Sequence, residues 1–318
     1  MKKIILIIIV AVVMLQGCVE KSEDYVDGDI QTTNQEGTEN EMNDTSDQKD
    51  PIDNKTEVSD MEENKTMKET EKATQVPTST PTPTPELVMP LTVNDTGKVL
   101  IQTVSTSTAY PYTSYIITSV NGESIVLDPT SMPDTDLVDI NPAGIFITHG
   151  HPDHNDRIFL QAYDCPTVKY EKADIQLNDF HVYTILSSHN NDTIIPENFN
   201  VMIVLEVDGL RIAHMGDIGQ TFLTEEQLKE LGEIDIAFMQ FENSYSSMSL
   251  KNKKGFQLIE QLNPKIVIPT HYTDNTLPVL EEKYGPITEF ENKLAIATED
   301  LPEKNLTVYR ILNNYKYK

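Results

Sequence analysis

The chain has 318 residues and is strongly acidic, with 51 Asp and Glu against 24 Lys and Arg and a formal net charge of −27 at pH 7. This balance argues against a nucleic-acid partner, because nucleic-acid binding rests on cationic contacts to phosphate. The length is sufficient for one sizeable hydrophobic core.

The first 18 residues have the features of a signal peptide. Met1-Lys2-Lys3 is basic, and residues 4–15 are apolar and uncharged. This run is shorter than the about 20 residues that a permanent membrane-spanning helix requires. Leu15-Gln16-Gly17-Cys18 resembles a bacterial lipobox, in which the cysteine is lipidated and becomes the new N-terminus. We therefore predict lipidation of Cys18 and an extracytoplasmic protein that contacts the membrane through its lipid anchor only; the alternative is an ordinary secretory signal with an incidental cysteine.

Residues 19–87 form a low-complexity segment that ends in a Thr-Pro run. Residues 19–86 carry 19 acidic residues against 6 lysines and almost no large apolar side chains. Such a composition buries too little apolar surface to offset the entropy of ordering, so we predict a disordered linker. As a coil it would span roughly 45 Å.

The remaining residues, 88–318, are predicted to form one folded domain. Its first strands are expected at residues 98–104, 115–120 and 124–127, with Asn121-Gly122 as a two-residue hairpin turn. Asp128 ends the third strand. With Cys18 acylated, Cys165 has no partner for an intrachain disulfide.

A cluster of metal-binding residue types follows the predicted buried strand 143–148. His149, His151, Asp153 and His154 lie within six residues, where the strand ends and the chain turns. Alternate residues of an extended backbone can point the same way, and imidazole with carboxylate suits zinc, iron or manganese. A solvated polar turn would explain one histidine but not three beside an aspartate, so we predict a metal site here.

The later elements alternate between strands and helices. Strands are expected at residues 167–170, 180–186, 201–207, 210–215, 234–240, 265–268 and 306–312. Helices are expected after residue 156, from the capping box at Thr224 to Gly232, and around residues 256–262. Strands first and alternating elements later fit an α+β fold in which two sheets are sandwiched between helices, the αββα architecture.

The His-x-His-x-Asp-His pattern of residues 149–154 resembles the signature of the metallo-β-lactamase superfamily. That superfamily also has a later histidine, an aspartate and a last histidine, each at a strand end, and His189, Asp217 and His271 occur in this order and context. The resemblance implies a first metal on His149, His151 and His189, and a second on Asp153, His154 and His271, with Asp217 as the bridge. It also gives Asp128 the role of bracing the metal loop, although a simple turn aspartate is an alternative.

The resemblance implies a binuclear hydrolase with two divalent ions, zinc first, with manganese and iron as alternatives. A metal-bound hydroxide would cleave a lactone, phosphodiester or amide in a small-molecule or lipid-like substrate, with Asp153 and Asp217 as catalytic residues. Residues 209–219 and 264–272 look most like the ascorbate-phosphate lactonase-like, or zinc-dependent hydrolase, branch. The glycine-rich loop of that branch is replaced here by residues 240–249. The rival hypothesis is a surface lipoprotein that contains metal and only binds a ligand.

Two histidines lie outside this ligand set. His181 falls inside a predicted strand and is interpreted as a structural or surface residue. His214 precedes Asp217 by three residues and is either a partner of a metal ligand or a core histidine with one hydrogen bond.

Overall fold

The computed structural model describes residues 93–110, 112–133 and 140–314. The predicted signal peptide, Cys18, the linker 19–87 and the first residues of the expected domain lie outside this part of the chain. No helix in the described part is long and apolar enough to cross a bilayer.

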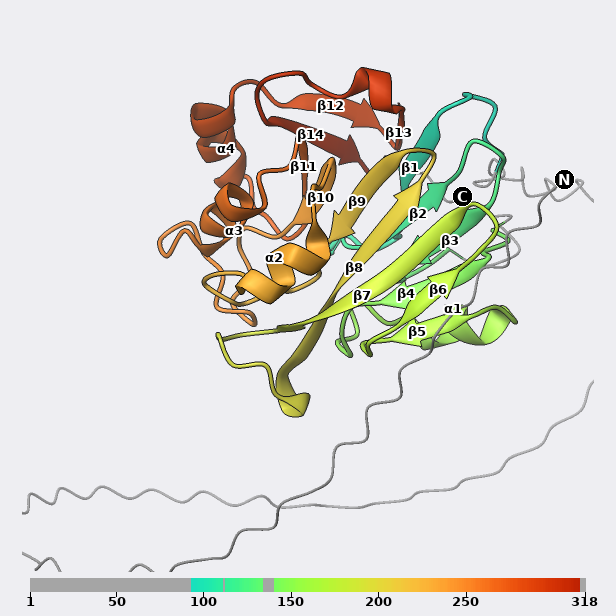
Figure 1. Ribbon diagram of the computed structural model, residues 1–318, viewed down its shortest axis with the longest axis horizontal. Helices are drawn as coiled ribbons and strands as arrows, with labels where there is room; N and C mark the ends of the chain where they lie inside the picture. Colours follow the sequence, from blue (N-terminus) through green and yellow to red (C-terminus); the bar gives the residue numbers. More distant parts are fainter. Residues whose placement is uncertain (1–92, 111, 134–139, 315–318) are drawn as a thin grey trace, which may run out of the picture. The chain divides into compact units, whose positions relative to one another are not determined.

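The first sheet has six strands (Figure 1). The loop with the histidine cluster follows its strand β4 (Gly144–Ile147). Three antiparallel pairs join β13, β1, β2 and β3, and β3, β4 and β5 are parallel. Asn121-Gly122 lies in the turn between β2 and β3, as predicted, but the loop has three residues and not two, because the Ser119 amide donates to the Glu123 carbonyl and Val120 joins the turn. In spatial order the strands are β13 (Lys293–Ile296), β1 (Val99–Thr103), β2 (Tyr115–Thr118), β3 (Ser124–Leu127), β4 (Gly144–Ile147) and β5 (Thr167–Lys169).

The second sheet has eight strands. From β6 to β9 the neighbours are antiparallel, and from β9 onward they are parallel. In spatial order the strands are β12 (Thr288–Glu291), β14 (Thr307–Leu312), β11 (Ile266–Pro269), β10 (Ile236–Met239), β9 (Leu210–His214), β8 (Phe199–Val207), β7 (Phe180–Ser188) and β6 (Asp174–Gln176).

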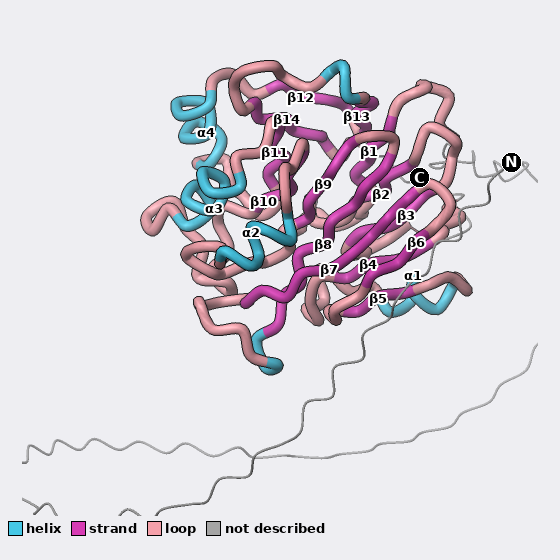
Figure 2. Tube along the Cα trace, viewed as in Figure 1, coloured by secondary structure: helices cyan, strands magenta, loops and turns pink. Residues whose placement is uncertain are grey.

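The helices flank the strands (Figure 2). Thr224 caps its helix with the predicted capping box, and Gly232 ends it. The helices are α1 (Arg157–Ala162), α2 (Glu225–Leu231), α3 (Lys254–Leu262) and α4 (Thr276–Tyr284), with the short 3-10 helices η1 (Pro196–Asn198) and η2 (Thr298–Asp300).

The hydrophobic residues form three layers, which confirms the αββα sandwich. In β10, Phe238 packs into the core between the sheets, whereas its neighbour Met239 joins Phe256 of α3 on the outer face. This follows from the period-two alternation of side chains along a strand. The outer face of the first sheet is covered more thinly, by Phe159 of the six-residue α1.

Among the strands and α-helices of the described part, four have no counterpart in the sequence prediction. β6 has only three residues and lies at a sheet edge. α4 contains Pro278, which a helix tolerates in its first turn although proline otherwise signals a break. β12 is largely exposed and β13 is short. Asn292 separates the two strands with a φ of +59°, and β12 belongs to the second sheet whereas β13 belongs to the first. The hydrophobic patterns of these four segments are too short or too polar to be recognised in the sequence.

His181 ties three strands of the second sheet together at the surface. Its Nδ1 lies 2.9 Å from Glu206 Oε2 on β8, and its Nε2 lies 2.8 Å from Asp174 Oδ1 on β6. The hydrogen bonds to Glu206 and Asp174 raise the pKa of this imidazole above its usual 6.5. The side chain therefore has a structural role, as the sequence predicts.

This raised pKa predicts a pH-dependent contribution to stability. Because the folded pKa exceeds the unfolded one, the stabilisation is present below about pH 6.5 and is lost as the pH rises through the folded value. Relative to wild type, His181→Gln should lower the free energy of unfolding in urea by about 0.2–1 kcal/mol at about pH 5.5 and by less at about pH 8.5. An equal difference at both pH values would contradict this assignment.

Candidate metal centre

The seven predicted ligands converge at one edge of the sandwich. His149, His151, Asp153 and His154 follow β4 of the first sheet. In the second sheet His189 follows β7, Asp217 follows β9, and His271 follows β11. In each case an apolar strand ends and the next few residues turn across the sheet edge, so buried backbone fixes the position of each ligand. Three groups of side chains in the described part could hold a metal ion, and all three lie here.

Asp217 stands between two sets of histidines. Its Oδ2 lies 3.5 Å from His149 Nε2 and 3.6 Å from His189 Nε2. Its Oδ1 lies 3.4 Å from His154 Nε2 and 3.1 Å from His271 Nε2. The two oxygens of one carboxylate thus face two different pairs of imidazoles.

Several polar atoms at the centre of this cluster have no hydrogen-bond partner. They include His149 Nε2, His189 Nε2 and Asp217 Oδ1, all buried. Buried polar groups are nearly always paired, so these atoms, which lie on both sides of the Asp217 carboxylate, call for a missing partner on each side. Divalent cations would supply these partners, and imidazole nitrogen with carboxylate oxygen is a donor set that suits zinc and its neighbours.

Asp153 and His151 are the remaining two predicted ligands, and they lie on opposite sides of Asp217. Asp153 Oδ2 lies 3.7 Å from His154 Nε2 and 3.8 Å from His271 Nε2. His151 is exposed and belongs with His149, His189 and Asp217 to one four-residue group. The structure therefore brings the predicted ligands together; which ions they hold remains a prediction.

Asp128 braces the metal loop from behind, so the simple turn aspartate is the weaker alternative. This fully buried carboxylate accepts from the Thr148 amide and hydroxyl, each at 2.7 Å. Its Oδ2 also lies 2.8 Å from His154 Nδ1 and 2.6 Å from His214 Nε2. A carboxylate on Nδ1 fixes the ring of His154 and leaves Nε2 free for a metal. His214 thus lies behind the predicted ligands and contacts Asp128, which in turn contacts the ligand His154.

The loop that carries Asp217 is held by a residue that the sequence does not single out. Asn200 Oδ1 accepts from the Asp217 amide at 2.9 Å, and its Nδ2 donates to the Met215 carbonyl at 2.9 Å. Gly216 has a φ of +55°, and a Cβ there would collide with Asn200 and Thr148. Close packing of the loop against both neighbours thus requires glycine.

Asn243 is a second residue that sequence reasoning missed. It lies in the segment that replaces the expected glycine-rich loop, and its Nδ2 donates to Asp217 Oδ2 at 2.6 Å. A side-chain amide in an irregular loop gives no periodic signal, although the changed composition of residues 240–249 does mark this stretch as unusual.

The electrostatics of the metal-free cluster suit a cation. Burial alone would raise the pKa of Asp217, but the charges of His154 and His271 hold it well below its usual range. Burial, and then the charge of His154, hold the pKa of His149 well below 6.5. Burial would lower the pKa of His154, but the nearby carboxylates of Asp217 and Asp128 raise it to about 9. A proton occupies the place where a metal would bind, and metal binding would release it.

Two clefts open onto the histidines. One of about 530 Å³ lies among His149, His151, His189, Tyr170 and Tyr245, and one of about 300 Å³ is lined by Asp153, Asp217 and Tyr110. Tyr272 is turned to other partners, since its hydroxyl accepts from Arg310 Nε at 2.8 Å and its ring stacks on Tyr112.

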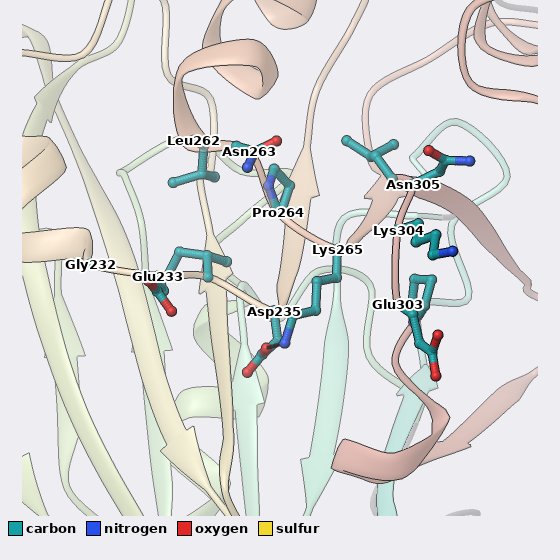
Figure 3. Close-up of a pocket in the computed structure, with 13 residues that line it drawn as sticks. Gly232, Glu233, Asp235, Leu262, Asn263, Pro264, Lys265, Glu303, Lys304 and Asn305 are labelled. Carbon is teal, nitrogen blue, oxygen red and sulfur yellow. Dashed lines mark hydrogen bonds and ion pairs between the residues drawn. The ribbon is translucent and has the colours of Figure 1, made fainter.

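A third cleft lies at the opposite ends of β10 and β11 (Figure 3). It measures about 410 Å³, and two of its lining residues form an ion pair, with Lys265 Nζ 2.8 Å from Asp235 Oδ1. Its lining includes none of the groups in the described part that could hold a metal.

Comparison with known proteins agrees with this geometry. Residues 108–271 match the profile of the family described as the beta-lactamase superfamily domain. A UPF0173 metal-dependent hydrolase of Anoxybacillus flavithermus is 25% identical over 200 residues, which cover 53% of this chain and 86% of that protein. One from Lysinibacillus sphaericus is 28% identical over 209 residues, which cover 53% of this chain and 85% of the relative.

A solved structure shares the fold. It is a Thermotoga maritima protein described as a Zn-dependent hydrolase of the metallo-beta-lactamase superfamily, with a TM-score of 0.50 and 19% identity. The match covers 67% of this chain and all of that one. The profile covers more than half of the chain and includes all seven predicted ligands. The chain therefore belongs to the metallo-β-lactamase superfamily of metal-dependent hydrolases.

Proposed function

We propose that the chain is a binuclear hydrolase that cleaves an ester-type bond, namely a lactone, phosphodiester or amide. The observation that carries this proposal is the position of Asp217, whose two oxygens face different histidine pairs. When bound, two divalent ions activate water, polarise the scissile bond and offset developing negative charge. Zinc is the first candidate, with manganese and iron as alternatives.

The chain's own residues would divide the work. His149, His151 and His189 would hold one ion, and His154, His271 and Asp153 the other. Asp217 would bind both ions, and its negative charge would offset part of their repulsion. Asp153 also lines the smaller cleft, where its carboxylate can accept a proton from the attacking water.

A metal assay with two substrates tests the proposal. Protein purified without chelators and reconstituted with zinc or manganese should contain two ions per chain by elemental analysis. It should also hydrolyse bis(p-nitrophenyl) phosphate or a simple γ-lactone, and removal of the ions should abolish turnover. Fewer than one ion per chain would contradict the binuclear centre. Two ions without turnover of these or related esters would favour the rival, a metal-containing lipoprotein that only binds a ligand.

The finer family branch is also part of the proposal. Residues 209–219 and 264–272 support the zinc-dependent hydrolase branch, and residues 240–249 depart from its usual loop. Because Asn243 in this segment donates to Asp217, we expect the departure to affect the substrate side of the site.

We further propose that this domain is displayed outside the cytoplasm on a lipidated Cys18, with residues 19–87 as a flexible spacer. The basic start, the apolar run and the lipobox-like residues support this. The expected organisation is a signal at 1–18, the linker at 19–87 and the hydrolase domain at 88–318.

Replacing Cys18 with alanine should abolish membrane retention, because the lipidated cysteine is the anchor once the signal is removed. Fractionation of cells that express wild type and Cys18→Ala measures this, with Cys165→Ala as the matched control. Cleaved Cys18→Ala protein that still sediments with membranes would contradict the lipobox.

A further inference from the structure

The clefts over the histidines have aromatic borders. Tyr245 is 74% exposed, its ring lies 6.2 Å from that of His151, and it borders both clefts. Tyr170 and Phe199 line the larger cleft, and Tyr110 lines the smaller one. An exposed ring of this kind offers a flat surface to a planar or apolar group.

Among the residues that the structure describes, no lysine or arginine lines either cleft. The sequence extends this observation to the loops that form this edge. Each of five segments contributes a loop at the metal edge and contains no lysine or arginine: 99–156, 173–210, 212–228, 230–250 and 266–282. These loops instead carry several carboxylates: Asp153, Asp192, Glu197, Glu242 and Asp274.

The basic residues of neighbouring segments are engaged elsewhere or lie outside the linings. Arg310 donates to Tyr272 and Glu289, and Lys254 donates to the Gly219 carbonyl at 2.7 Å. Lys169 precedes Tyr170 but lines neither cleft. Apart from the metal-bound group itself, an anionic part of a substrate would therefore meet carboxylates and no lysine or arginine.

We propose that this site selects a substrate whose only polar anchor is the group at the metals. The rest of the substrate is uncharged, has a planar or apolar face that lies against Tyr245, and carries no second phosphate or carboxylate. The inference rests on the proposed metal function and narrows it, because it excludes substrates with a phosphate remote from the scissile bond.

Binding of two matched probes tests this without requiring turnover. Benzohydroxamate and 4-carboxybenzohydroxamate share a metal-binding head and differ by one remote carboxylate. Calorimetry with the zinc-loaded full chain should show about tenfold tighter binding of the uncharged probe at about 0.01 M salt. The difference should shrink at about 1 M salt, where charges are screened within a few ångströms. Equal binding of the two probes at low salt, or tighter binding of the carboxylate, would overturn the proposal.

Variants locate the effect. Tyr245→Ala should weaken the uncharged probe several-fold, because it removes the exposed ring. Glu197→Lys should reduce the difference in affinity between the two probes, since it places a cation beside the larger cleft. Glu303→Lys makes the same charge change at the third cleft and should leave the difference intact. If Glu303→Lys narrowed it equally, overall charge and not the cleft would discriminate, and the proposal would be wrong.

The same samples separate this inference from the proposed function. Two ions per chain and the expected probe preference, without turnover of any ester, would refute the hydrolase and support the selectivity. Turnover of an ester together with equal affinity for the two probes would support the hydrolase and refute the selectivity. A chain that holds no zinc and binds neither probe would refute the metal centre and the inference with it.

Discussion

Asp217→Ala is expected to reduce the metal content from two ions per chain to fewer than one and to lower hydrolysis at least about 100-fold. One oxygen faces His149 and His189 and the other faces His154 and His271, so loss of the carboxylate affects both ions. The carboxylate also offsets the repulsion between two cations a few ångströms apart. Elemental analysis and initial rates on the same preparation measure both effects.

Single-histidine variants provide the contrast. His189→Ala should weaken chiefly the ion held with His149 and His151, and His271→Ala chiefly the other. His181→Ala removes a histidine that contacts Glu206, Asp174 and Tyr183 and is not among the predicted ligands, so this variant should retain both ions. An Asp217→Ala protein with two ions and near wild-type rates would show that Asp217 does not bridge the metals.

Asp128→Asn is expected to cost about 3–5 kcal/mol of folding stability and to impair the metal held by His154. The buried carboxylate accepts from the Thr148 amide and hydroxyl and from His154 and His214. Burial would raise its pKa, but the charges of His154 and His214 and their hydrogen bonds hold it well below its usual range. The asparagine side chain has one acceptor oxygen, and its NH₂ group would face buried groups that now donate to the carboxylate. Those buried donors would therefore lose their hydrogen-bond partners.

The chain contains a matched control for this change. Asp128 and Asp208 have φ values of +45° and +46°, and asparagine tolerates this backbone conformation. Asp208 is exposed and accepts one hydrogen bond, from the Val120 amide. Asp208→Asn should therefore change the free energy of unfolding in urea by less than about 1 kcal/mol. Similar losses for the two variants would mean that backbone conformation, not the buried hydrogen bonds, is responsible.

The positions of the ligands were predictable because each follows an apolar strand. His189 directly follows β7, and His271 comes two residues after the apolar β11. β7 and β9 both run antiparallel to β8, and β9, β10 and β11 are parallel, so β7, β9 and β11 run in one direction and their carboxyl ends lie at one edge. The Asp208-Gly209 hairpin and the Thr224 capping box were predictable for a similar reason, since local turn and cap chemistry fixes them.

The residues that position the ligands could not be predicted in this way. Asn200 lies within β8, and its contact with Asp217 spans a hairpin. Asn243 reaches Asp217 from an irregular loop. Polar side chains that hold other side chains across sequence-distant contacts follow no periodicity. For Asp128 the sequence left two roles open, and only the fold brings His214 from the other sheet to its carboxylate.

The division of the ligands between the sheets links metal binding to cooperative folding. His149, His151, Asp153 and His154 come from the first sheet, and His189, Asp217 and His271 come from the second. The proposed ions would therefore act as cross-links between two layers that also pack through apolar side chains and share the Asp128–His214 contact. If one layer opened by itself, it would have to release both ions. Amide hydrogen exchange in the strands of both sheets should consequently slow together when metal is added, because the ions bind the closed sandwich alone.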